Sequence, residues 1–282
     1  ANGEIGDYLI ENQNIAVIIS DLGHTVHYAD TGGNIIDAGI TNSRNDEVEE
    51  LYLYLDDDWP RQAHYSNIEI VNNVDHSIIT ASGVDSDNSS IDIVTDYILF
   101  DDDEYLSITT TLTNNGSSVS NYELGDAFSW GNCWQFAPVH GTEFANTTTE
   151  KWMAGFATSV SYGYISPLGD IWGENGSGWV DLNVDTVTIG SGSSVSYTRY
   201  FAIGNGDTGT VAKSLHSASG AATGSLECLM KMDDDSPIGG GNIDAFLNND
   251  IYLQMATTSN GTALTTLPAG NWRLEASATG FE

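Results

Sequence analysis

The chain has 282 residues and a formal charge of −33, because 40 Asp and Glu residues stand against only seven Lys and Arg residues. So few basic residues cannot form the groove that a nucleic acid needs, and they exclude binding to anionic membranes for the same reason. The hydrophobic content of 40% and aromatic content of 10% exclude a disordered acidic chain. The excess charges repel one another over about 10 Å at 0.1 M salt, so the composition predicts an extracellular or cell-surface protein in a saline or calcium-containing environment.

The length allows one large domain or two smaller ones, at roughly 150 residues per domain. No segment has the roughly 20 apolar residues of a membrane-spanning helix, so we expect no membrane insertion. The chain starts at Ala1 without a basic and apolar leader, which is typical of a mature or excised product. Cys133 and Cys228 are the two cysteines, so at most one disulfide can form.

Short runs of alternating or β-branched residues, separated by Gly, Asn and Asp, predict many antiparallel strands. In the first part of the chain these runs are 15–20, 25–29, 34–37, 68–71, 77–81, 91–100 and 105–113. Asp101, Asp102 and Asp103 interrupt the last two runs and predict a hairpin turn. Residues 46–55 fit a short helix or another strand, and the expected helix content is low.

The stretch 126–179 is rich in aromatic residues and is either the main core or a sugar-stacking surface, with core packing favoured. Small residues dominate 214–224, which we interpret as a linker or the strand that enters a second domain. Beyond it, runs at 225–232, 251–257 and 272–278, with a turn at Asn260-Gly261, predict a small β unit.

Several motifs in the first 215 residues are specific enough to compare with known proteins: Gly6-Asp7-Tyr8-Leu9-Ile10-Glu11-Asn12, Gly32-Gly33-Asn34-Ile35-Ile36-Asp37, Tyr105-Leu106, Thr111-Leu112-Thr113-Asn114, Gly125-Asp126-Ala127, Trp130-Gly131, Phe136-Ala137-Pro138, Ser161-Tyr162-Gly163-Tyr164 and Arg199-Tyr200-Phe201-Ala202-Ile203-Gly204-Asn205-Gly206-Asp207. With these motifs, this part of the chain resembles the non-catalytic N-terminal β-supersandwich, galactose-mutarotase-like in fold, of secreted bacterial or archaeal proteins related to PHP-type metallohydrolases. The resemblance implies a scaffold. It does not imply the hydrolase, whose His-x-His metal cluster is missing because no two of the six His residues are separated by one residue.

The last part of the chain contains two further motifs, Thr265-Thr266-Leu267-Pro268-Ala269-Gly270-Asn271-Trp272-Arg273-Leu274 and Gly280-Phe281. With these motifs, residues 221–282 resemble a carboxypeptidase-regulatory-like, transthyretin-like domain. Members of that family carry one or two further strands after this point, so the resemblance implies an unfinished sheet at Glu282. An open sheet edge is a place for pairing with another chain, or the sign of a cut polypeptide.

Candidate binding residues are few. Trp172 and Trp179, set among Gly, Asn and Ser, are the best candidates for stacking on a glycan, and Trp134 is a third.

The supersandwich also resembles sugar mutarotases, and His140 with Glu143 is the one pair that fits their acid–base chemistry. His24 and His27 are three positions apart, which places them on opposite faces of a strand and makes a shared metal unfavourable.

Calcium is the ion that best matches the acidic loops, because hard cations take carboxylate and carbonyl oxygens. The first candidates are Asp233, Asp234 and Asp235, which a Gly-rich loop follows, and the next are Asp101, Asp102 and Asp103. Neither run completes the spacing of an EF-hand loop, so solvated acidic loops remain the alternative.

These observations predict an all-β protein, with a β-supersandwich at 1–217 and a transthyretin-like β domain, possibly without its last strand, at 218–282. We expect a secreted or cell-surface structural or adhesive protein that is not an enzyme and that self-associates, into a filament or layer, by completing its sheets between subunits. The alternatives are a carbohydrate-binding module and a mutarotase-like or glycan-processing enzyme.

Overall fold

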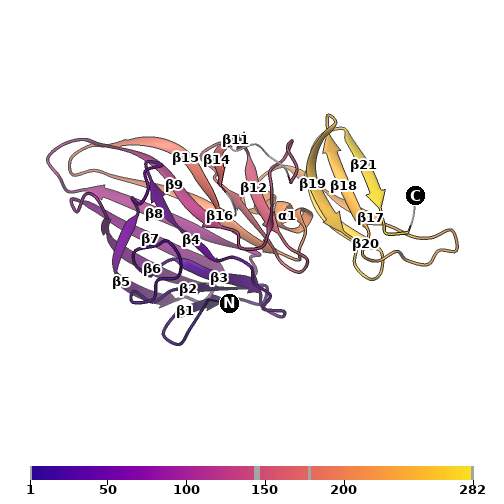
Figure 1. The fold of residues 1–282 in the computed structure, drawn as a ribbon, viewed down its shortest axis with the longest axis horizontal. Coiled ribbons are helices and arrows are strands. Elements are labelled where there is room, and N and C mark those ends of the chain that lie inside the picture. The colour runs from indigo at the N-terminus through magenta and orange to yellow at the C-terminus, as the bar shows by residue number, and fades with distance from the viewer. Residues whose placement is uncertain (1, 143–146, 177–178, 281–282) are drawn as a thin grey trace.

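The computed structural model describes residues 2–142, 147–176 and 179–280, which form β1 to β21 and the helix α1 (Figure 1). The predicted all-β class is confirmed. Two eight-stranded antiparallel sheets make the larger body, and β17 to β21 make a smaller sandwich, drawn in yellow in Figure 1, at one end of the long axis.

The two large sheets are called sheet A and sheet B below. Sheet A runs in the order β1 (Tyr8–Glu11), β2 (Ile15–Ile19), β3 (Ile35–Ile40), β4 (Glu50–Leu55), β9 (Ser120–Ser129), β15 (Trp179–Ile189), β14 (Ile171–Gly176) and β11 (Thr147–Glu150). Sheet B runs in the order β10 (Trp134–Phe136), β12 (Trp152–Phe156), β13 (Ser161–Ile165), β16 (Ser194–Gly204), β8 (Tyr105–Asn114), β7 (Ile91–Phe100), β6 (His76–Asp85) and β5 (Ala63–Asn72).

The hairpin of β7 and β8 follows directly from the sequence pattern. Buried and more exposed side chains alternate along both strands, as they do when one face of a strand covers a core. The turn between them contains the Asp101–Asp103 run, and the Asn12 side chain donates to the backbone carbonyls of Phe100 (2.7 Å) and Asp103 (2.8 Å). The acidic run is therefore a turn, as predicted, and it is fixed to the loop that joins β1 to β2.

The main core lies between sheets A and B and contains Phe128, Trp130, Tyr162 and Tyr164 of the aromatic-rich stretch. Phe136 and Trp152 belong instead to the cluster that includes α1. Trp130 and Tyr162 are fully buried, and Trp130 stacks on Phe128 with ring centroids 3.7 Å apart. Tyr162 stacks in turn on Phe201 at 5.7 Å. Core packing, the interpretation favoured by the sequence, accounts for these side chains.

A buried ion pair crosses this core. The guanidinium of Arg199, 1% exposed, donates to both carboxylate oxygens of Asp126 at 2.5 and 2.6 Å. It also donates to the Thr110 hydroxyl at 2.6 Å, and the Tyr164 hydroxyl donates to Asp126 at 2.6 Å. Strands from both sheets are thus connected by charge-assisted hydrogen bonds inside the sandwich.

The small sandwich has two sheets of its own. One pairs β17 (Thr223–Leu229) with β20 (Thr262–Pro268), and the other has the order β19 (Asp250–Ala256), β18 (Asn242–Leu247), β21 (Trp272–Ser277). The helix α1 (Thr208–Ala218) lies between this sandwich and the outer face of sheet B. Its Val211 and Leu215 share one apolar cluster with Trp152 of β12 and with Leu253 and Met255 of β19.

Two sequence expectations change. Residues 25–29 form irregular backbone instead of a strand, and residues 214–218 belong to α1 instead of a linker. The helix has weak intrinsic propensity, but Asp207 caps it by accepting the Thr210 amide at 2.7 Å, and burial of its apolar side stabilises it. Residues 46–55 contain the strand β4, one of the two alternatives. Both cysteines are free.

Replacement of one partner of the buried ion pair provides a test of this core. We expect Asp126→Asn to lower the free energy of unfolding by about 3–5 kcal/mol, because the Arg199 charge stays buried without a counter-charge. Urea unfolding followed by tryptophan fluorescence measures the loss. The matched control is Lys213→Gln, which removes a half-exposed pair with Glu104 and should cost less than about 1 kcal/mol. If both variants lost the same free energy of unfolding, the buried ion pair would not have the stabilising role assigned to it.

Candidate functional site

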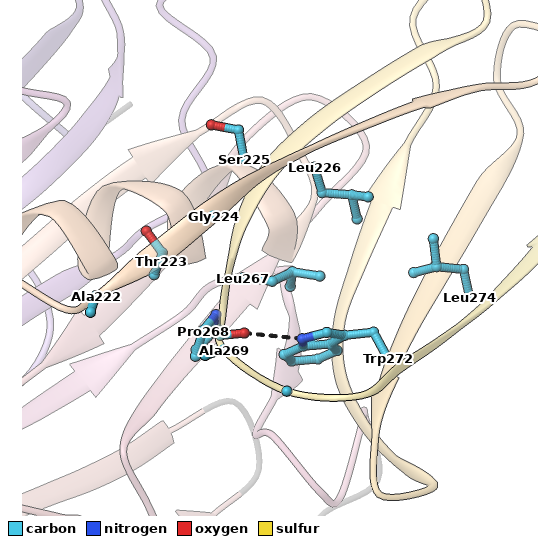
Figure 2. Close-up of a pocket in the computed structure, with 11 residues that line it drawn as sticks. Ala222, Thr223, Gly224, Ser225, Leu226, Leu267, Pro268, Ala269, Trp272 and Leu274 are labelled. Carbon is cyan, nitrogen blue, oxygen red and sulfur yellow. Dashed lines mark hydrogen bonds between the residues drawn. The ribbon is translucent and has the colours of Figure 1, made fainter.

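The most prominent hollow is an apolar groove in the small sandwich. Its volume is about 620 Å³, and Figure 2 shows its walls, formed by β17, the end of β20 and β21. Leu226, Leu267, Trp272 and Leu274 point into or border the groove, and the Trp272 indole donates to the Pro268 carbonyl at 3.0 Å. None of its eleven lining residues is charged, although 17% of the chain is.

The strands that border this groove each have one unpaired edge within the part of the chain that the structure describes. There β17 pairs with β20 alone, and β21 pairs with β18 alone. The side of the sandwich formed by β19 and β20 is instead covered by α1. Leu274 on β21 is 42% exposed, so its side chain is only partly covered by the described residues. The groove therefore combines an apolar floor with backbone groups that lack a neighbouring strand.

The transthyretin-like motif predicted from the sequence falls at this groove. Leu267 and Pro268 end β20, and Gly270 lies in the turn that leads into β21. A Cβ at Gly270 would lie 2.8 Å from the end of the Leu247 side chain, so a larger residue in this turn would require that side chain to shift. The motif fixes the turn that separates the two walls of the groove.

A second hollow of about 300 Å³ lies where the small sandwich meets sheet B. Trp134, 62% exposed, and Phe156 form its aromatic wall with ring centroids 5.8 Å apart. Asn242 and Gln254 contribute polar side chains from β18 and β19. An exposed indole beside amide groups is suited to stacking on a sugar ring and to hydrogen bonding its hydroxyls.

Asp207 also borders this second hollow but has a structural role. Its carboxylate accepts the backbone amides of Thr210 at 2.7 Å and Ala256 at 2.9 Å, so it caps α1 and holds β19. Burial raises the pKa of this carboxyl, and the backbone hydrogen bonds oppose the rise. It is therefore not counted among the sugar-contacting groups.

The three tryptophans proposed for glycan stacking are not brought together. Trp134 lies on sheet B in the second hollow, whereas Trp172 is half-buried on β14 of sheet A. Trp179 begins β15, and its side chain lies outside the described part of the structure.

Trp172 has a polar neighbour that the sequence analysis missed. In the strand register, Trp172 is opposite Asn183, which is opposite Gly125. Asn183 is 4% exposed, and among the described residues neither its side-chain nitrogen nor its side-chain oxygen has a hydrogen-bond partner. Gly125 makes room for this amide, because an added Cβ would lie 2.6 Å from its oxygen. The sequence feature that could have revealed this buried amide is an Asn between the apolar residues Leu182 and Val184, because buried polar side chains are rarely without partners.

The predicted calcium ligands lie in separate turns. Asp234 accepts from Ser236, while Asp235 pairs with Lys231. Across the chain, Asp102 accepts from the Gln13 side chain at 2.7 Å, and burial raises the pKa of Asp103. Among the described residues no three His, Cys, Asp or Glu side chains are grouped so that they could hold a metal ion. Calcium binding stays a prediction.

The histidines considered from the sequence are placed separately. His24 lies 3.0 Å from Asp7, and His27 lies 3.8 Å from Glu49. Glu143, the proposed partner of His140, lies outside the described residues. The described neighbour of His140 is Glu150, at 3.4 Å, whose pKa is raised by burial and lowered in part by His140.

Comparison with protein-family models and with curated proteins finds no match. Solved structures are similar in fold. An α-galactosidase of Lactobacillus brevis is 7% identical with a TM-score of 0.51 over 75% of this chain, and a variant GH36 α-galactosidase AgaA of Geobacillus stearothermophilus, in complex with stachyose, is 8% identical with 0.52 over 75%. A TPR-domain containing protein of Parabacteroides distasonis is 11% identical with 0.50 over 70%.

This chain covers 41%, 42% and 46% of those three proteins, so it spans less than half of each. At such low identity the likeness concerns the fold alone. It is consistent with a large antiparallel β-sandwich, while the galactose-mutarotase-like assignment and the relation to PHP-type proteins stay predictions.

No helix within the described ranges has the length and apolar character needed to cross a bilayer.

The pH dependence of stability can be tested at a buried carboxyl. Burial raises the pKa of Asp46 to about 7, opposed by a backbone hydrogen bond from Ala38 and supported by the neighbouring Asp37. The folded state then retains a proton that the unfolded state loses near 3.8, so this group's contribution to stability is present below about pH 4 and is lost as the pH rises to about 7. Asp46→Asn should flatten this part of the profile in urea unfolding from pH 4 to 8, and an unchanged slope would contradict the assignment.

Proposed function

We propose that this protein is a non-catalytic structural or adhesive module at a cell surface or in the extracellular medium, which assembles by receiving a β-strand from another polypeptide chain. The observation that carries the proposal is the apolar groove between β17 and β21, with an unpaired edge on each strand. Unpaired edges present rows of N–H and C=O groups that are templates for a further strand. Main-chain hydrogen bonds provide the affinity in this mode of recognition, and side-chain pockets provide the specificity.

The side chains around the groove favour the same function. Leu274 is 42% exposed and lies beside Leu226 and Trp272, so a strand placed over them would remove apolar surface from water. Burial of such surface contributes roughly 25 cal/mol per Å². An added strand would therefore satisfy the open backbone and cover the apolar floor in one step.

The charge of −33 sets the conditions for assembly. Copies of this chain repel one another, and the repulsion falls as ionic strength rises. Calcium at the Asp-rich turns, including Asp233, Asp234 and Asp235, would reduce it further. We therefore expect assembly to need salt and to be promoted by calcium.

The first test measures assembly by light scattering and electron microscopy in high salt, with calcium or with a chelator. We expect larger species in calcium and salt, and about a tenfold smaller assembled fraction for Leu274→Asn, a loss equivalent to about 1.4 kcal/mol. The matched control is Leu264→Asn, which changes an exposed leucine on β20 that does not line the groove. Monomers under every condition would refute assembly.

A second candidate function is carbohydrate binding in the hollow beside Trp134. The exposed indole, the adjacent Phe156 and the amides of Asn242 and Gln254 favour it. Two fold neighbours are α-galactosidases, one of them in complex with stachyose. The likeness in fold adds weight but does not identify a sugar.

Tryptophan fluorescence titrated with stachyose, raffinose and a wider glycan panel tests this candidate. We expect saturable quenching that Trp134→Ala abolishes, because this side chain would form the stacking surface. Trp59→Ala is the matched control, since Trp59 is 54% exposed but does not line the hollow. No change with any glycan, or equal loss in both variants, would remove carbohydrate binding at this place.

A further inference from the structure

The strand β5 is a second open edge, far from the groove. It is ten residues long and, in the described part of the chain, pairs with β6 alone. Ile70 is 53% exposed, Val71 is 47% exposed, and Val74 in the following turn is 99% exposed. Figure 1 places β5 at the opposite end of the long axis from β17 and β21. Within the described residues, each end of the molecule thus has a strand with one free edge.

The other large-sheet edges are less suited to pairing. At the ends of the two large sheets, β1 and β11 have four residues each and β10 has three. Both four-residue strands end in a carboxylate, Glu11 and Glu150. Short edge strands and charged side chains are how proteins prevent unwanted strand pairing. By contrast, β5 is ten residues long, and its outer half carries a single charged residue, Glu69.

The inner face of β5 is buried at Ala63 and Tyr65, half-buried at Ile68 and exposed at Ile70. Ile68 and Ile70 are opposite Ala81 and Ile79 of β6, both of which are buried. The strand β1 packs over β6, and Ile70 remains exposed, so the sandwich does not extend far enough to cover the end of β5. This end of β5 presents apolar side chains that need a partner.

The groove and the outer half of β5 both carry little charge. The groove has no charged lining residue, and Glu69 is the one charged residue between Tyr65 and Val74. Two chains of charge −33 can approach most closely through surfaces that carry few carboxylates. The partner that fits best is therefore a second copy of this chain.

We infer that β5 of a second copy pairs with the free edge of β17, so that Ile68 and Ile70 cover Trp272 and Leu274. This inference rests on the proposed strand-receiving function and names the strand that is received. Because donor and acceptor lie at opposite ends, the contact is heterologous, and repetition of it produces a filament or a closed ring.

Cysteine cross-linking between two single variants tests this contact. In a background of Cys133→Ser and Cys228→Ser, one preparation carries Val71→Cys on β5 and the other carries Ser225→Cys on β17. Both positions are exposed and lie on the outer faces of their strands. Under mild oxidation in salt and calcium, the mixture should form disulfide-linked dimers at least fivefold above either variant alone. Glu69→Cys replaces Val71→Cys in a parallel mixture, so that a two-residue difference in register is also detected.

The outcomes separate the inference from the proposed function. The β5 contact is overturned if the protein still assembles but neither mixture forms cross-links. It is also overturned if the Ser225→Cys preparation forms dimers without a β5 variant. Both outcomes leave the proposed strand-receiving function in place. Complete absence of assembly overturns both. A second measurement uses the protein with Cys133 and Cys228 unchanged. There, Ile70→Asn should lower the assembled fraction about tenfold. The control is Val119→Asn, which replaces a 62% exposed valine and should leave the assembled fraction unchanged. Equal effects of these two variants overturn the β5 contact.

Discussion

The structure depends on the requirement that a β-strand must pair its edges and cover its apolar face. Sheets A and B meet this requirement through their centre, where each sheet covers the inner face of the other. The helix α1 meets it for the outer face of sheet B, since Val211 and Leu215 approach closely over Gly163, which has no side chain. Within the described residues, β5, β17 and β21 each combine a free edge with exposed apolar side chains, and these are the strands to which we assign assembly.

The few basic residues of the chain limit its binding to polyanionic partners. Each of the seven basic residues already pairs with a carboxylate of this chain: Arg44 with Glu11, Arg61 with Asp56 and Asp85, Lys151 with Asp170, Arg199 with Asp126, Lys213 with Glu104, Lys231 with Asp235 and Arg273 with Glu275. The cations therefore neutralise local carboxylates. A polyanionic partner would have to displace these pairs, which agrees with the exclusion of nucleic acid from composition.

The sequence was most informative where a structure is local. The hairpin of β7 and β8 needs only alternation and a turn, and both can be recognised along the chain. It was least informative for α1, because its helical conformation depends on the cap at Asp207 and on contacts with strands that come both before and after it. The groove was anticipated as an unfinished sheet, but its walls join residues some 40 positions apart, and the pairing of Trp172 with Asn183 depends on register.

The small sandwich is firmly attached to the larger body, which matters for a groove that would carry mechanical load. The Thr208 hydroxyl donates to the Gln254 carbonyl at 3.2 Å and accepts from the Gln254 amide at 2.7 Å, while Thr265 donates to the Gly209 carbonyl at 2.7 Å. Thr208 and Gly209 belong to α1, whose apolar side packs on sheet B. Force on a strand held by β17 would pass through β20 and α1 into a large sheet, because these elements share one apolar cluster and direct hydrogen bonds. A flexible linker would not transmit force in this way, and so the attachment itself favours a structural role for the groove.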